Sequence, residues 1–213
     1  MSFKTIVIDD HEAARLGLAV MLEGSSINIA GSTASAEEAL AALETEKFDA
    51  ALVDVQMSQT DGLALLTKLR ELHPDLPVIF ISAYDYPIYI ARAVANGALG
   101  YVLKSDPIGD VEKAIQHAVV ESLPHPEGRL YRIKRKMSDS ISTSELPAEF
   151  PITPREAQVL RHIAFGLSNR EIAASLRISV ETVKEHVQNI LRKTGAADRT
   201  DVAVRAVRLG FND

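Results

Sequence analysis

Short apolar runs alternate with longer amphipathic stretches over the first 122 residues. The runs are Thr5–Asp9, Ile27–Gly31, Ala50–Asp54, Val78–Ser82 and Gly100–Leu103. Between them lie stretches with helical spacing of apolar positions near residues 13–22, 35–46, 61–72, 86–96 and 107–122. Nearly continuous apolar runs of this length are typical of strands that are covered on both faces. Five such strand–helix units predict an α/β domain with an open, doubly wound parallel sheet and right-handed crossovers.

The pattern is lost after residue 122, and we interpret residues 123–150 as a linker. Several prolines and a serine-rich segment, Ser138–Ser144, interrupt any periodicity there. The same region contains the basic segment Arg129–Lys136. It could contact DNA phosphates or the first domain, but basic clusters are commonly solvated surface, and a solvated linker is the interpretation we adopt.

Residues 151–213 have helical periodicity throughout. Thr153-Pro154-Arg155-Glu156 and Ser168-Asn169-Arg170-Glu171 each have the spacing of a capping box, in which a hydroxyl and a carboxylate satisfy free backbone amides. Ser179 precedes a third helix that Gly195 ends, and a fourth is expected from about residue 200 to 209. Four short helices in this length predict a small all-α domain.

Composition narrows the functional classes. The chain has no cysteine, which excludes disulfides, cysteine nucleophiles and zinc fingers. No apolar run approaches the length of a membrane span, and the start lacks a signal-peptide pattern, so we expect a cytoplasmic protein. The net charge of −6 is divided unevenly: residues 1–122 carry −10, residues 123–150 carry +1 and residues 151–213 carry +3. This asymmetry indicates two modules with different partners.

Polar residues gather where the predicted strands end. Asp9 and Asp10 end the first run, Asp54 the third and Ser82 the fourth, and Lys104 follows the fifth. The carboxyl ends of parallel strands meet at one sheet edge, where ligands of such folds bind. Three carboxylates together suit Mg²⁺, while a lysine and a hydroxyl suit phosphoryl oxygens. Each residue alone could be a helix cap, a loop acid or a solvated charge, but their joint placement favours a site that carries a phosphoryl group.

These residues, together with Ser82-Ala83 and Gly100-Tyr101-Val102-Leu103-Lys104, resemble the receiver domain of response regulators over about residues 4–122. The resemblance implies a flavodoxin-like fold with a five-stranded parallel sheet. It also implies that Asp54 is the phosphoacceptor and that Asp10 and Asp54 bind the metal directly. Asp9 is expected to act on the metal through water, and Gln56 through its backbone carbonyl.

The same resemblance assigns a switch to the other strand ends. Ser82 is expected to turn toward the phosphoryl group, Tyr101 to rotate inward with it, and Lys104 to pair with the phosphate. A merely packed aromatic is the alternative for Tyr101. Asp61-Gly62 matches the family's turn after the phosphorylated loop. Ser58 departs from the family, which usually has proline there, and we expect this to loosen the loop without removing a reacting group.

The third helix of the tail has a buried-type stripe formed by Val183, Val187, Ile190 and Leu191. The segment from Ile152 to Arg199 is similar to the LuxR-type helix-turn-helix of the NarL/FixJ class, whose second helix lies in the DNA major groove. The resemblance places three side chains at base-reading positions: Lys184, Glu185 and Gln188. Three others are expected to meet the DNA backbone or to support the helix: Thr182, Lys193 and Arg199. A helical interaction module with a solvated face is the alternative.

Together these resemblances predict a transcriptional regulator rather than an enzyme. A sensor histidine kinase would phosphorylate Asp54, and the chain would bind promoter DNA as a homodimer, at least when phosphorylated, with RNA polymerase as a further candidate partner. An aspartyl-phosphate phosphatase of the haloacid-dehalogenase type is disfavoured because Asp54-Val55-Gln56-Met57 lacks that family's second acid. A regulator that works without phosphorylation, whose receiver serves dimerisation or interaction, remains the alternative.

Overall fold

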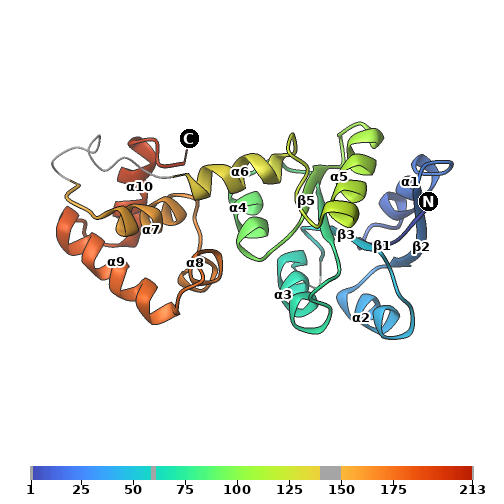
Figure 1. The fold of residues 1–213 in the computed structure, drawn as a ribbon, viewed down its shortest axis with the longest axis horizontal. Coiled ribbons are helices and arrows are strands. Elements are labelled where there is room, and N and C mark those ends of the chain that lie inside the picture. The colour runs from blue at the N-terminus through green and yellow to red at the C-terminus, as the bar shows by residue number, and fades with distance from the viewer. Residues whose placement is uncertain (1, 59–60, 140–149, 213) are drawn as a thin grey trace. The chain divides into compact units, whose positions relative to one another are not determined.

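The computed structural model describes residues 2–58, 61–139 and 150–212. The chain divides into two compact units, Met1–Arg132 and Ile133–Asp213. Figure 1 shows the ribbon of both units, and each is described here by itself. Among the described residues, the first unit contains five strands, and the regular elements of the second are helices.

The first unit is built on one parallel sheet with the strand order β2-β1-β3-β4-β5. The strands are β1 (Phe3–Ile8), β2 (Ile27–Thr33), β3 (Ala50–Asp54), β4 (Val78–Ser82) and β5 (Gly100–Leu103). Every residue of β3 and β4 is buried, as expected for strands covered on both faces. The predicted five-stranded α/β fold is confirmed, and the predicted bounds of β3, β4 and β5 agree with the structure.

Five helices cover the sheet. They are α1 (Glu12–Met21), α2 (Ala36–Thr45), α3 (Gly62–Leu72), α4 (Pro87–Ala95) and α5 (Ile108–Glu121). Leu18 of α1 and Ile115 of α5 share one buried cluster with Leu52 and Ile81 of the central strands. Helices α2 and α3 contact each other and lie on the opposite face (Figure 1). In the sheet, β1 lies between β2 and β3. After β2 the chain therefore crosses to the other side of β1, and this reversal of strand order places a crevice at the carboxyl ends of β1 and β3.

A sixth helix, α6 (Arg129–Ser138), occupies much of the segment that we predicted to be linker. Its Leu130 and Met137 are buried, with exposed fractions of 1% and 3%. The interpretation of this segment as solvated was therefore wrong for Leu130 and Met137, whereas Arg132, Lys134 and Arg135 are exposed as expected. Leu130, Ile133 and Met137 recur at helical spacing, but the helix is short and half of its residues are basic, so it depends on the few side chains that it buries. The serine-rich segment predicted within the linker lies largely outside the described residues.

The second unit contains α7 (Pro154–Ala164), α8 (Asn169–Leu176), α9 (Val180–Thr194) and α10 (Arg199–Arg208). Both predicted capping boxes are present, at Thr153 and Ser168. Ser179 caps α9, and Gly195 ends it with a φ of +62°, a conformation that favours glycine. Residues from all four helices are fully buried, among them Leu160, Ile172, Ile190 and Val202. This confirms the predicted all-α domain.

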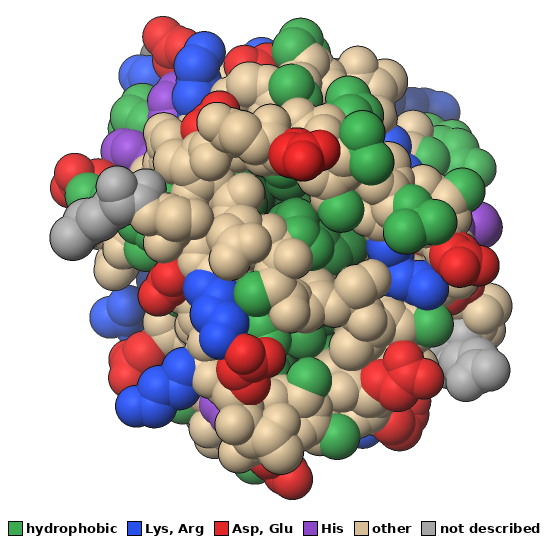
Figure 2. Space-filling view, turned by 90° about the vertical axis from the view of Figure 1, so that its right-hand side faces the viewer, with side chains coloured by type: hydrophobic (Ala, Val, Ile, Leu, Met, Phe, Trp, Pro, Cys, Tyr) green, Lys and Arg blue, Asp and Glu red, His purple; other side chains and the backbone are tan. Residues whose placement is uncertain are grey.

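Several apolar side chains lie on the exterior of the first unit. Leu16, Val20 and Met21 of α1 are among the exposed ones. Figure 2 looks at the end of the first unit and shows hydrophobic side chains interspersed with acidic and basic ones. Among the residues that the structure describes, no helix combines the length and hydropathy that are needed to cross a bilayer.

Candidate functional site

Four potential metal ligands converge at the carboxyl ends of β1 and β3. Ligand atoms of Asp9, Asp10, His11 and Asp54 all lie within 4.8 Å of one another. The side chain of Asp9 is fully buried, and Asp54 is 4% exposed. The three predicted aspartates are therefore brought together. His11 was not singled out from the sequence, although its position directly after the acid pair on the loop before α1 is the signal that could have found it.

Lys104 lies between two of these carboxylates. Its Nζ is 2.6 Å from Oδ2 of Asp9 and 3.2 Å from Oδ1 of Asp54. Partial burial would lower the pKa of Lys104, but the hydrogen bond that Lys104 donates to Asp9 and the charge of Asp54 outweigh this effect, so the pKa lies above its usual value. The lysine is thus held as a cation beside the predicted phosphoacceptor.

The surroundings of Asp54 disfavour the ionised form of its carboxyl group. Burial raises its pKa to about 6, and the charge of Asp9 adds to the rise, while Lys104 opposes it. The backbone around it is tightly packed, because a Cβ at Gly62 would lie 2.2 Å from the carbonyl oxygen of Asp54. Glycine is therefore required at the turn that follows Asp61, whose carboxylate caps α3.

Asp10 presents one free oxygen to the cluster. Its Oδ2 accepts a 2.7 Å hydrogen bond from the backbone amide of Ser58. Its Oδ1 is buried and accepts no hydrogen bond, with only the Nδ1 of His11 as an ion-pair contact at 2.8 Å. A buried carboxylate oxygen without a hydrogen-bond donor, next to two further carboxylates, fits a hard cation such as Mg²⁺. The amide of Ser58 also ties the start of its loop to Asp10, and the looser loop expected from Ser58 stays a prediction.

The two predicted switch residues are linked through one backbone residue, Tyr84. The amide of Tyr84 donates to Oγ of Ser82 at 3.1 Å. The hydroxyl of Tyr101 donates to the carbonyl oxygen of Tyr84 at 2.9 Å. Both switch side chains are buried, and burial raises the pKa of Tyr101. Ser82 and Tyr101 thus both hold the loop between β4 and α4.

A cavity of about 450 Å³ opens onto the cluster. Its lining includes Asp54, Ser82, Lys104 and Gln56. Gln56 lies at the rim with an exposed side chain, whose Nε2 donates to the hydroxyl of Tyr89 on α4 at 2.7 Å. The backbone carbonyl predicted as a metal ligand stays a prediction. The cavity brings an acceptor carboxylate, a lysine and a hydroxyl to one opening, the set that transfer of a phosphoryl group requires.

In the second unit, one face of α9 is buried and the other is open. Val183 and Ile190 are fully buried. Lys184, Glu185 and Gln188 are exposed, as predicted for base-reading positions. The Nζ of Lys184 lies 3.8 Å from Oε1 of Glu181 one turn earlier, a long contact between two exposed side chains that leaves the ammonium accessible.

Two family descriptions match the two units. The response regulator receiver domain matches residues 5–116, and the luxR family of bacterial regulatory proteins matches residues 151–206. The chain belongs to the response regulator family. As a member, it joins a receiver domain to a LuxR-type DNA-binding domain in a regulator of transcription.

Relatives of this response regulator share both domains. It is 33% identical to the response regulator protein VraR of Staphylococcus aureus over 208 residues, 97% of each chain. The crystal structure of the response regulator ChrA of a heme-sensing two-component system covers 99% of this chain and 98% of its own, with 29% identity and a TM-score of 0.53. The structure of RcsB from Salmonella enterica serovar Typhimurium was solved bound to promoter rprA in the presence of phosphomimetic BeF₃⁻. It is 22% identical to this chain with a TM-score of 0.54, and the match covers 100% of this chain and 98% of RcsB. At this identity the likeness shows the fold alone.

Three other candidate DNA contacts of this response regulator are engaged inside its own domain. The Nζ of Lys193 lies 2.7 Å from Oε2 of Glu156, the buried acid of the first capping box. Arg199 donates to Oδ1 of Asn169 at 2.8 Å and to the carbonyl oxygen of Leu167. The hydroxyl of Thr182 lies 2.9 Å from that of Ser179 at the start of α9. Of the two roles expected for these residues, the contacts favour support of the helix.

Proposed function

We propose that this response regulator accepts a phosphoryl group on Asp54 and reads promoter DNA with α9. One observation carries the proposal: Asp9, Asp10 and Asp54 converge at the sheet edge with Lys104 between two of them. A lone loop acid would not need a lysine ammonium held between it and a neighbouring carboxylate, whereas an acceptor of a phosphoryl group does. A sensor histidine kinase is the donor that a receiver domain implies.

The residues that would hold Mg²⁺ are Asp10 and Asp54 directly, Asp9 through water and Gln56 through its backbone carbonyl. When bound, Mg²⁺ would neutralise charge on the phosphoryl oxygens. The free Oδ1 of Asp10 supports this assignment. The Nδ1 of His11, 2.8 Å from that oxygen, would have to yield to the cation.

The reaction needs Asp54 as a carboxylate. One of its oxygens attacks phosphorus, the bond from phosphorus to the imidazole nitrogen of the kinase breaks, and the electron pair stays on that imidazole. Lys104 then pairs with a phosphoryl oxygen in place of its present carboxylate partners. Ser82 turns its hydroxyl to another oxygen, and Tyr101 follows it inward. No external substrate is turned over, so the chain acts as a regulator and not as an enzyme.

The output is DNA binding by the second domain. Lys184, Glu185 and Gln188 face outward from α9, and a helix of this kind reads base edges in the major groove. Phosphorylation would bias the chain toward a homodimer whose two copies of α9 read paired half-sites. RNA polymerase is a further candidate partner at a promoter.

The test is phosphorylation of the full chain by phosphoramidate with Mg²⁺, followed by phosphate-affinity electrophoresis. Asp54→Asn should abolish the shifted band, Asp10→Asn should require more Mg²⁺, and Asp75→Asn, at an exposed acid far along the chain, should behave as wild type. An undiminished band from Asp54→Asn would contradict the assignment. Normal phosphorylation with no effect on dimerisation or DNA affinity would favour the regulator that works without phosphorylation.

A further inference from the structure

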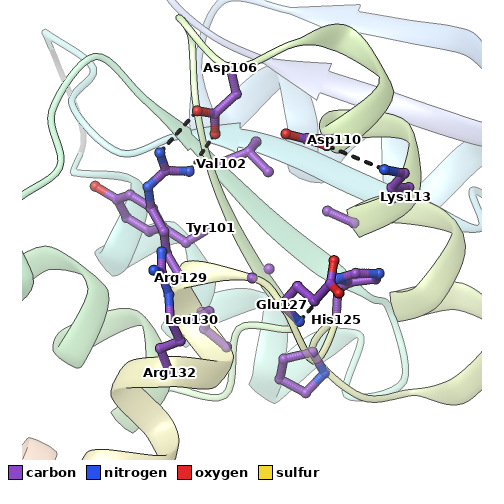
Figure 3. A pocket seen from close by; sticks show the side chains of 14 residues that line it. Tyr101, Val102, Asp106, Asp110, Lys113, His125, Glu127, Arg129, Leu130 and Arg132 are labelled. Atoms are coloured by element: carbon purple, nitrogen blue, oxygen red, sulfur yellow. Dashed lines mark hydrogen bonds and ion pairs between the residues drawn. The ribbon is translucent and has the colours of Figure 1, made fainter.

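The first residue of α6 is tied to two loops of the receiver. The guanidinium of Arg129 forms a bidentate pair with Asp106, with Nη1 at 2.6 Å from Oδ2 and Nη2 at 3.0 Å from Oδ1. Its Nε donates to Oδ2 of Asp85 at 3.1 Å. Figure 3 shows the guanidinium meeting Asp106 beside Tyr101. One arginine therefore connects α6 to the β4–α4 loop and to the β5–α5 loop at once.

Both loops carry residues of the proposed phosphoryl site. Asp85 directly follows Tyr84, whose amide is bound by Ser82 and whose carbonyl oxygen is bound by Tyr101. Asp106 comes two residues after Lys104, and its Oδ2 also accepts from the amide of Leu103 at 2.8 Å. The start of α6 is thus one side chain away from the loop that the switch residues hold.

The two arms of this contact differ in strength. The side chain of Asp106 is only 11% exposed, and a bidentate guanidinium–carboxylate pair is a strong one. The side chain of Asp85 is 54% exposed, and its single bond to Arg129 is correspondingly weak. Leu130 anchors the same turn by burial, and a cavity of about 280 Å³ lined by Tyr101, Arg129 and Arg132 adjoins it. The Asp85 arm can therefore break while α6 stays attached through Asp106 and Leu130.

We propose that the contact of Arg129 with Asp85 senses the state of the phosphoryl site and loosens the first turn of α6 when Asp54 is phosphorylated. The inference rests on the proposed function. When Ser82 turns toward the phosphoryl group and Tyr101 follows, Tyr84 loses both of the bonds that anchor it. Asp85 then moves with Tyr84 and leaves Arg129 with Asp106 alone. The segment that leads out of the receiver becomes the reporter of its phosphorylation.

Phosphorylation and the contact between Arg129 and Asp85 affect each other in both directions. An interaction that exists only in the unphosphorylated state opposes phosphorylation. Removal of the contact between Arg129 and Asp85 must therefore strengthen binding of a phosphoryl mimic, by the same factor by which binding of the mimic weakens that contact. Because the Asp85 arm is half exposed, we expect that factor to be about two- to fivefold. Asp85→Asn and Arg129→Gln should both show it.

The experiment uses the full chain with beryllofluoride and Mg²⁺ as the probe. Amide hydrogen exchange is followed at residues 132–135 at the start of α6, where the amide of Arg132 donates to the carbonyl oxygen of Gly128, and beryllofluoride affinity is measured by calorimetry. In wild type, the probe should speed exchange at these amides. In Arg129→Gln, exchange should be fast without the probe, and the probe should bind about two- to fivefold more tightly. Asp85→Asn should reproduce the tighter binding.

Arg132→Gln is the matched control. Arg132 lies one turn along on the same helix and lines the same cavity, so Arg132→Gln removes a similar charge while both ion pairs of Arg129 stay in place. It should leave the exchange and the affinity as in wild type. Tight beryllofluoride binding with unchanged α6 exchange, or equal affinities for Arg129→Gln, Asp85→Asn and wild type, would overturn the inference and leave the proposed function intact. Failure of wild type to bind beryllofluoride would instead overturn the proposed function, and the sensing role with it.

Discussion

The backbone amide of Ser58 donates a 2.7 Å hydrogen bond to Oδ2 of Asp10, a residue that stands 48 positions earlier in the chain. Burial alone would raise the pKa of Asp10, but the hydrogen bonds from Ser58 outweigh it and hold the pKa below its usual value. The carboxylate is thereby fixed with Oδ1 left for a cation. A proline at position 58, the residue that this family usually has, could not donate this bond.

Ser58→Pro should therefore weaken Mg²⁺ binding. A hydrogen bond to a charged group contributes about 1.5–3 kcal/mol, and loss of part of that in the metal-bound state corresponds to about a three- to tenfold increase in the dissociation constant. Calorimetric titration with Mg²⁺ measures it. Ser58→Ala retains the amide, the larger of the two Ser58 contributions to the lowered pKa of Asp10, and should weaken Mg²⁺ binding less than Ser58→Pro does. Equal weakening by both substitutions would show that the side chain, not the amide, matters.

Asp54→Asn should stabilise the first unit in the absence of metal at neutral pH. Its carboxyl has a pKa of about 6 in the folded chain against 3.8 as the reference, so its stabilising effect is complete below pH 3.8 and is lost as pH rises through about 6. At pH 7.5 the substitution should raise the free energy of unfolding by about 1–3 kcal/mol. All five tyrosines precede residue 133, so urea unfolding followed by tyrosine emission in EDTA reports on this unit. A gain that is as large at pH 4 would contradict the pKa assignment.

His162 should make the second unit sensitive to acid. It is buried, its Nδ1 lies 2.8 Å from the carbonyl oxygen of Gln158, and its Nε2 lies 2.9 Å from the hydroxyl of Ser175. Burial lowers its pKa below the usual 6.5. Below pH 6.5 the unfolded chain therefore binds a proton that the folded chain does not, and the free energy of unfolding falls until the folded pKa is reached. An NMR titration, with His162→Gln to assign the signal, measures this pKa. A value at or above 6.5 would contradict the prediction.

Lys193 should matter for folding more than for DNA sequence preference. Its partner Glu156 is 4% exposed and would be left as an uncompensated buried charge. Lys193→Met should lower the free energy of unfolding of the second unit by about 2 kcal/mol, seen in thermal melts by circular dichroism at 222 nm. Lys184→Met, at an exposed lysine on the same helix, should change it by less than about 0.5 kcal/mol. Similar melting curves for the two variants would contradict a structural role of Lys193.

Substitution of Glu185 should distinguish base reading by this acid from simple repulsion of the DNA phosphates. It is exposed beside Lys184 and Gln188 on the outer face of α9. An acid there either accepts a hydrogen bond from cytosine or repels phosphates. We expect Glu185→Ala to weaken binding to the operator by about 1–3 kcal/mol and to leave random DNA unaffected, as measured by fluorescence anisotropy. Tighter binding to both DNAs would identify the acid as a repulsive charge.

Much of the fold and of the candidate site can be predicted from the sequence because the sequence signals are local. The buried strand at residues 78–82 is an apolar run, and the capping boxes at Thr153 and Ser168 are complete within four residues. Asp9, Asp54 and Lys104 could be placed together because parallel strands end at one edge, so that topology alone brings distant residues into one site.

Only the tertiary structure decided the contacts between side chains far apart in the chain. The α6 segment reads as a basic linker, and its helix depends on Leu130, on Met137 and on the pairing of Arg129 with Asp106. Lys193 reads as a surface cation until Glu156 is seen beside it. Such hydrogen bonds and ion pairs require partners 23 and 37 positions away, and no periodicity or cap near either residue encodes them.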